Sequence, residues 1–194
     1  MAVKEDRRVR RTKRLLREAF IELVAEQGYD TVRIEDILER ADIARTTFYT
    51  HFRDKRALLN YVADVFRETS QARIADIQID ASGLPTVAQI EKTFSNFKEN
   101  APFFRMVLNT SGVPLLYEQV HQALANVVET LAIQNSQPGG VEPEVPHSLR
   151  AYHFAGSLLS TARWWLEGDR IYLISAEKMA EMFIQLHKAS PIPA

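Results

Sequence analysis

The side chains best suited to chemistry lie in residues 44–53 (ARTTFYTHFR). Wound as a helix, at about a hundred degrees per residue, this stretch turns Phe48 and Phe52 to one side, where they would face a core. The other side has no acidic residue; it carries Arg45, Thr46, Tyr49, Thr50 and Arg53, with Thr47 and His51 on the flanks. Guanidinium and hydroxyl groups hydrogen-bond to phosphates and to base edges. We therefore predict a nucleic-acid-binding face, which includes Tyr49 because the helical wheel places it opposite the two phenylalanines.

Three helices are expected to position this face. Apolar spacing predicts a helix over residues 5–28, closed by Gly28, a short helix over 34–41 and a third over 45–52. Their expected common core consists of Phe20, Ile37, Ile43, Phe48 and Phe52. Because only a tight turn separates the two short helices, the pattern is typical of a helix-turn-helix, whose second helix enters the major groove of DNA.

The stretch from Thr31 to Leu59 closely resembles the signature of the TetR family of bacterial regulators. The centre of the resemblance is Thr47-Phe-Tyr-x-His-Phe-x-x-Lys55-x-x-Leu-Leu59, preceded by a Gly-Tyr pair at 28–29. It is strong over about residues 10–66. Beyond them it rests on chain length, the number of helices and an aromatic-rich penultimate helix, which look like the family's ligand-binding and dimerising body.

The resemblance implies two kinds of contact with double-stranded DNA. The residues that match phosphate-contacting positions are Arg33, Thr47, Tyr49, His51 and Lys55. The candidates for reading base edges are Arg45, Thr46 and Thr50. An arginine among the second group could bond guanine in a bidentate manner.

Two positions depart from the family's pattern. Where the family often has Gly-Val-Ser, this chain has Asp42-Ile43-Ala44. Ala44 lacks the hydroxyl that usually caps the recognition helix, a loss of about 0.5–2 kcal/mol. Asp42 adds a negative charge near the turn. Neither departure removes the motif, and we expect both to affect the detail of the base contacts.

The whole chain is predicted to be all-α, with about nine helices. The helix-turn-helix domain should cover residues 1–56, followed by a connecting helix over about 54–78, capped by Asp54, and by a helical effector-binding and dimerisation domain over 79–194. In the second domain, helices are expected at 86–100, 102–110, 114–135, 147–168 and 175–188. A linker is expected at 80–85 and a loop at 136–146, where prolines and glycines gather.

Charge is unevenly distributed along the 194 residues, although the net charge is only −1. The first sixty residues hold fourteen lysines and arginines against eleven acidic residues, and the rest hold ten against fourteen. A basic end on an acidic body predicts that one part contacts a polyanion. The basic run at 4–17 could contact phosphates, or it could be the solvated face of the first helix.

Several classes of protein are not expected. The chain has no cysteine, so it has no disulfide or thiolate metal site. It lacks a secretory signal and any apolar run long enough to span a membrane, which predicts a bacterial cytoplasmic protein associated with the nucleoid. No nucleophile–base pair, glycine-rich loop or paired carboxylates indicate an enzyme, no cofactor is expected, and the histidines lack the spacing of a metal site.

The C-terminal half is rich in residues that could line a pocket for a hydrophobic or aromatic effector. The candidates are Phe97, Phe104, Leu108, Tyr117, His121, Tyr152 and Trp164. Each of them could instead fill a core. Small residues on the helix predicted over 147–168 could let two copies approach closely; they are Ala151, Ala155, Gly156, Ser160 and Ala162.

These patterns favour a DNA-binding transcriptional regulator. The hypothesis in full is a homodimeric repressor, released from a palindromic operator by a small hydrophobic or aromatic effector. One alternative is a DNA-binding regulator or activator that responds to no effector. A remote alternative is a helical small-molecule-binding protein or enzyme.

Overall fold

A computed structural model describes residues 6–74, 85–108, 114–134 and 144–188, and there the chain folds into ten helices. The all-α prediction is confirmed. The linker expected at 80–85 and the loop expected at 136–146 lie almost wholly outside the described residues, as does the start of the basic run. No helix within the described ranges is both long enough and apolar enough to cross a membrane.

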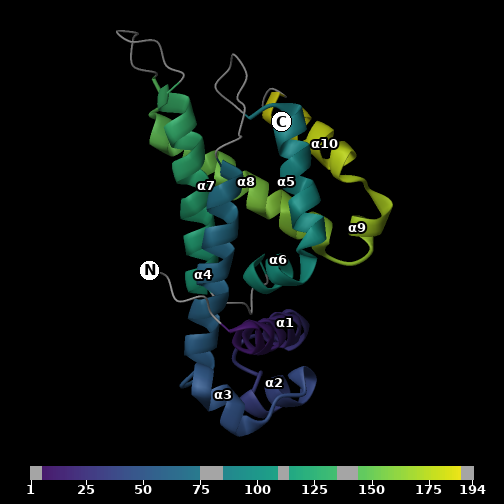
Figure 1. The fold of residues 1–194 in the computed structure, drawn as a ribbon. Coiled ribbons are helices and arrows are strands. Elements are labelled where there is room, and N and C mark those ends of the chain that lie inside the picture. The colour runs from purple at the N-terminus through teal and green to yellow at the C-terminus, as the bar shows by residue number, and fades with distance from the viewer. Residues whose placement is uncertain (1–5, 75–84, 109–113, 135–143, 189–194) are drawn as a thin grey trace.

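The first three helices gather at one end of the molecule, drawn in purple and dark blue in Figure 1. They are α1 (Arg7–Gln27), α2 (Ile34–Ala41) and α3 (Arg45–His51). Phe20, Ile37 and Phe48 are fully buried between them, as predicted. Gly28 ends α1 with a φ of 84°, a backbone conformation that residues with a Cβ rarely adopt.

From this end, α4 (Lys55–Ile74) runs along the molecule towards the C-terminal body (Figure 1). It begins as predicted, because the Asp54 carboxylate accepts a hydrogen bond of 2.7 Å from the Ala57 N–H. Leu58 and Val62, in its first two turns, are almost inaccessible to solvent. The connecting helix is thus packed at its base rather than free.

The C-terminal body consists of α5 (Val87–Glu99), α6 (Ala101–Leu108), α7 (Pro114–Gln134), α8 (His147–Leu166), α9 (Arg170–Leu173) and α10 (Ala176–Lys188). Helices α7 and α8 pack side by side, and α10 packs on α5. The short helix α9 was not predicted, because four residues are too few to show a helical period. The core is aromatic: Trp165 is fully buried against Phe94, and its indole N–H donates to the Ile174 carbonyl at 3.1 Å.

Candidate nucleic-acid interface

The third helix has the two faces that its sequence predicts. Phe48 is fully buried and Phe52 nearly so. The exposed residues of α3 are Arg45, Thr46, Tyr49 and Thr50, with Thr47 and His51 half-buried at the edges. Tyr49 is 45% exposed, so it lies on the side away from the core, as the helical wheel predicts. The structure therefore brings the predicted base-reading residues together on one solvent-facing surface.

The turn before α3 explains one departure from the family's pattern. Asp42 has a φ of 53° and a ψ of 49°, in the left-handed region, and its N–H contacts the carbonyls of Leu38 and Glu39. Glycine adopts this conformation without a Cβ penalty, whereas aspartate is one of the few other residues that tolerate it. The chain thus keeps the turn but places a carboxylate where the family often has no side chain.

The other departure leaves α3 without a side-chain cap. Ala44 occupies the N-cap position, and no side chain accepts a hydrogen bond from the first turn. We expect Ala44→Ser to raise the free energy of unfolding by about 0.5–2 kcal/mol, because the new hydroxyl would accept from an unpaired backbone N–H. Urea denaturation measures this gain. Ala88→Ser is the matched control, since Ala88 is exposed in α5 behind an existing cap at Thr86; an equal gain in both variants would contradict the capping explanation.

Arg45 is held across the turn by an acidic partner. Its guanidinium lies 3.0 Å from the Glu35 carboxylate of α2 and 5.8 Å from the centre of the Tyr49 ring. Both partners in the ion pair are well exposed, so the pair contributes little to stability. Its effect is to orient the arginine over the exposed face of α3. Thr50 donates its hydroxyl hydrogen to the Thr46 carbonyl at 3.0 Å, which leaves its oxygen free to accept.

Lys55 is engaged inside the protein. Its ammonium donates to the carbonyls of Tyr29 and Val32, both at 2.7 Å, and lies 4.2 Å from the centre of the Tyr29 ring. Burial lowers the pKa of the Lys55 amine. An ammonium has three N–H donors, and the two carbonyls of the turn between α1 and α2 accept from two of them. The sequence could not reveal this role, because the acceptors are backbone atoms.

An arginine that the sequence analysis did not single out joins α2 to α1. The Arg40 guanidinium contacts Glu26 through two bonds of 3.0 and 2.9 Å and Glu22 through a third of 3.4 Å. The hydrogen bond from Arg40 lowers the pKa of the Glu26 carboxyl. This ion-pair network bridges α2 and α1 on the surface, whereas the buried apolar residues between the two helices hold them together. Arg33 is exposed just before α2, where its own N–H donates to the Asp36 carboxylate at 2.8 Å.

The seven effector candidates separate into three groups. Phe97, Phe104 and His121 are buried; the first two pack ring against ring, with their centres 4.5 Å apart. Tyr152 and Trp164 are about half exposed on α8. Leu108 and Tyr117 line a cavity of about 300 Å³ together with Ser160 and Arg163.

His121 ties α7 to α8. It donates through Nε2 to the Tyr152 carbonyl at 3.2 Å, and its ring contacts those of both Tyr117 and Tyr152. A Cβ on Gly156 would come within 3.3 Å of the same Nε2, so the close approach favours glycine there. Among the described residues, no three metal-ligating side chains cluster in a way that could hold a metal ion.

Two family models match the chain. The model of "Bacterial regulatory proteins, tetR family" matches residues 16–62, and that of "Transcriptional regulator C-terminal region" matches residues 87–189. One curated relative is the uncharacterized HTH-type transcriptional regulator YxbF of Bacillus subtilis (strain 168), 32% identical over 125 residues. That match covers 61% of this chain and 32% of YxbF, so the aligned part spans about a third of the relative's length.

Solved structures share the fold along nearly the whole chain. NalD of Pseudomonas aeruginosa, the secondary repressor of the MexAB-OprM multidrug efflux pump, superposes with a TM-score of 0.71 at 16% identity, over 93% of this chain and 95% of NalD. The fatty acid degradation regulator FadR of Bacillus halodurans gives a TM-score of 0.67 at 16% identity, over 91% and 93% of the two chains. At these identities the likeness establishes the fold alone.

Proposed function

The chain belongs to the TetR family of bacterial transcriptional regulators, and we propose that it acts as a homodimeric repressor that a small hydrophobic or aromatic effector releases from a palindromic operator. The observation that carries the proposal is the exposed face of α3, with Arg45, Thr46, Tyr49 and Thr50 side by side and no carboxylate within the helix. A seven-residue helix with this face, held by two neighbours, fits the major groove.

In this proposal Arg45, Thr46 and Thr50 read base edges. Arg33, Thr47, Tyr49, His51 and the remaining N–H of Lys55 contact phosphates and fix the register of the protein on the duplex. The basic first turns of α1 add charge next to the same surface; their arginines are Arg7, Arg8, Arg10 and Arg11. The negative charge of Asp42 at the turn opposes phosphate binding at short range and is screened by salt.

Dimerisation is supported by the outer face of α8. Leu149, Tyr152 and Trp164 recur there at helical spacing and are 58%, 50% and 48% exposed. Ser160 is exposed on the same face, and its small side chain would let a second copy approach closely, whereas Gly156 is partly buried against His121 of α7. The alanines at 151, 155 and 162 contribute differently, because they are buried in the protomer's own core. Two copies joined through this face would present two α3 helices to successive major grooves.

The cavity beside Leu108 and Tyr117 is the proposed effector site. Its wall is apolar at Val107 and Leu159, and Ser160 and Arg163 supply polar groups. The Tyr117 phenol is a hydrogen-bond donor at neutral pH, and burial raises its pKa further from that range. An effector that fits only one spacing of the two α3 helices would shift the population away from the DNA-bound form.

Thermal-shift screening with hydrophobic and aromatic compounds tests the effector part of the proposal. A true effector should raise the Tm, because it binds the folded state only. Tyr117→Ala should abolish that ligand-induced rise, whereas Tyr172→Ala, on an exposed part of α9, should leave it unchanged. If no compound raises the Tm, the effector-independent regulator becomes the better account of this chain.

A further inference from the structure

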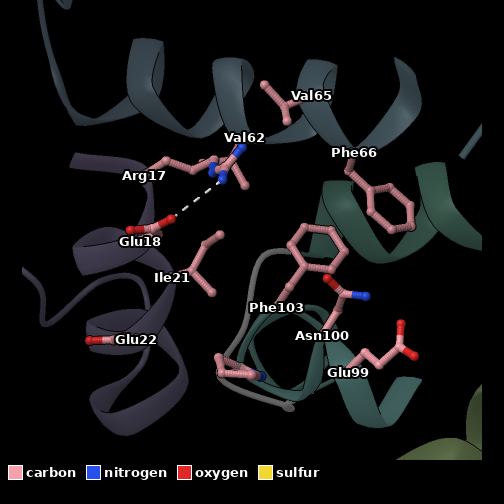
Figure 2. Close-up of a pocket in the computed structure, with 11 residues that line it drawn as sticks. Arg17, Glu18, Ile21, Glu22, Val62, Val65, Phe66, Glu99, Asn100 and Phe103 are labelled. Atoms are coloured by element: carbon pink, nitrogen blue, oxygen red, sulfur yellow. Dashed lines mark ion pairs between the residues drawn. The ribbon is translucent and has the colours of Figure 1, made fainter. Parts of the chain in front are cut away.

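A second cavity, of about 410 Å³, lies where the helix-turn-helix domain meets the C-terminal body (Figure 2). Its walls come from α1, from α4 and from the junction of α5 with α6. It is distinct from the proposed effector site, because it shares no lining residue with the cavity beside Leu108 and Tyr117. The volume lies within the range of ordinary small-molecule pockets, about 300–1,000 Å³.

The inner wall of this interdomain cavity is apolar and aromatic. Phe66 of α4 and Phe103 of α6 stack with ring centres 4.4 Å apart and an interplanar angle of 21°. Ile21 of α1 points toward the same space, and Val62 adds to the wall from α4 (Figure 2). An aromatic ring or a short alkyl chain would lose its contact with water against these side chains.

The rim is acidic. Three carboxylates border the cavity, from Glu18, Glu22 and Glu99, against one guanidinium, from Arg17. The Glu18 carboxylate lies 3.7 Å from the Arg17 guanidinium, and the Glu22 carboxylate lies 3.4 Å from the Arg40 guanidinium, so both are in ion pairs. Glu99 is exposed and has no ion-pair partner in the described part of the chain, so its charge is the one left uncompensated.

These features together select a class of ligand. An ammonium group would be attracted to Glu99 and to the faces of nearby aromatic rings. A carboxylate ligand would meet a like charge at the same point, which disfavours anions. We propose that the interdomain cavity is a second small-molecule site that binds an amphipathic organic cation, with its apolar part against Phe66 and Phe103 and its ammonium beside Glu99.

Because the cavity lies between the two parts of the chain, a ligand bound in it should affect DNA recognition. The packing of α1 on α6 is the main contact between the two parts of the chain, and the cavity opens beside it. A ligand that touches both α1 and α6 would favour one orientation of the helix-turn-helix over others. By linkage, its affinity and the affinity for DNA must then depend on each other.

Three probes with one carbon skeleton test the site on the full chain: 4-phenylbutylammonium, 4-phenyl-1-butanol and 4-phenylbutanoate. Calorimetry should show the ammonium binding about fivefold tighter than the alcohol, as expected for one partly solvated ion pair, and the carboxylate weakest. Amide resonances of α1, of α4 and of residues 99–103 should shift with the ammonium. Glu99→Gln should remove the preference for the ammonium, and the control Glu177→Gln, an exposed carboxylate on α10, should keep it.

Three results would overturn the proposal: equal binding of the ammonium and the alcohol, an unchanged preference in Glu99→Gln, or resonance shifts confined to the cavity beside Leu108 and Tyr117. None of them bears on DNA binding by α3. The coupling has its own readout, because the ammonium should change the affinity of the protein for a duplex selected from a random pool. Unaltered DNA affinity in a saturated protein would contradict the regulatory consequence.

Discussion

Replacing Arg45 and Tyr49 together by alanine should abolish retention of the operator in an electrophoretic shift assay. A bidentate arginine–guanine contact discriminates by about 1–3 kcal/mol, so each half-site should lose about tenfold or more in affinity, and a dimer has two half-sites. Both side chains are exposed, and the Arg45–Glu35 ion pair contributes little to folding. The free energy of unfolding should therefore fall by no more than about 2 kcal/mol, mostly because the Tyr49 ring loses its edge contact with Phe48, whose centre lies 5.3 Å away.

The single variants should differ in kind. Arg45→Ala should relax sequence preference at one position of each half-site. Arg33→Ala should instead weaken binding to all duplexes alike. For each phosphate that the protein no longer neutralises, the slope of log affinity against log salt concentration should become shallower by about one. Tyr172→Ala is the matched control for the removal of an exposed aromatic side chain. If the double variant retained the operator as well as the wild-type protein does, the result would contradict the assignment of α3 as the helix that reads DNA.

Lys55→Ala should lower the free energy of unfolding by about 2–4 kcal/mol, the second large effect. The substitution removes two charge-assisted hydrogen bonds and leaves the carbonyls of Tyr29 and Val32 without this donor in a partly buried place. It also removes the contact with the face of the Tyr29 ring. The turn between α1 and α2 should loosen, and with it the position of α2 against α3.

Urea denaturation measures this decrease, and Arg56→Ala, the exposed neighbour in α4, is the control. DNA binding by Lys55→Ala should be compared only under conditions in which the variant is fully folded. A variant with wild-type stability and greatly reduced DNA affinity would show that the ammonium serves phosphates rather than the turn.

The recognition face was predictable because a helical period decides which side chains point outward. Phe48 and Phe52 determine the inward side of α3, and Arg45, Tyr49 and Thr50 follow from it. The left-handed backbone conformation of Asp42 is likewise predictable, because it occurs at a position where the family often has glycine. In both cases the information is local.

What the sequence could not supply depends on tertiary contacts. The partners of Lys55 are carbonyls more than twenty positions earlier, and no side-chain pattern marks them. Arg40 meets Glu22 and Glu26 across two helices. Among the effector candidates, Phe104 and Tyr117 both recur at helical spacing, yet one fills the core and the other borders a cavity. Aromatic residues satisfy the same pattern in either place.

Selection of bound sequences from a random duplex pool is the most direct test of a dimer that reads DNA through α3. The two-fold arrangement predicts a palindrome whose half-sites lie about one helical turn or a multiple of it apart, and Arg45→Ala should select a more degenerate half-site at the same spacing. A winning sequence without two-fold symmetry would contradict the dimer, and an unchanged half-site in Arg45→Ala would contradict base reading by that residue.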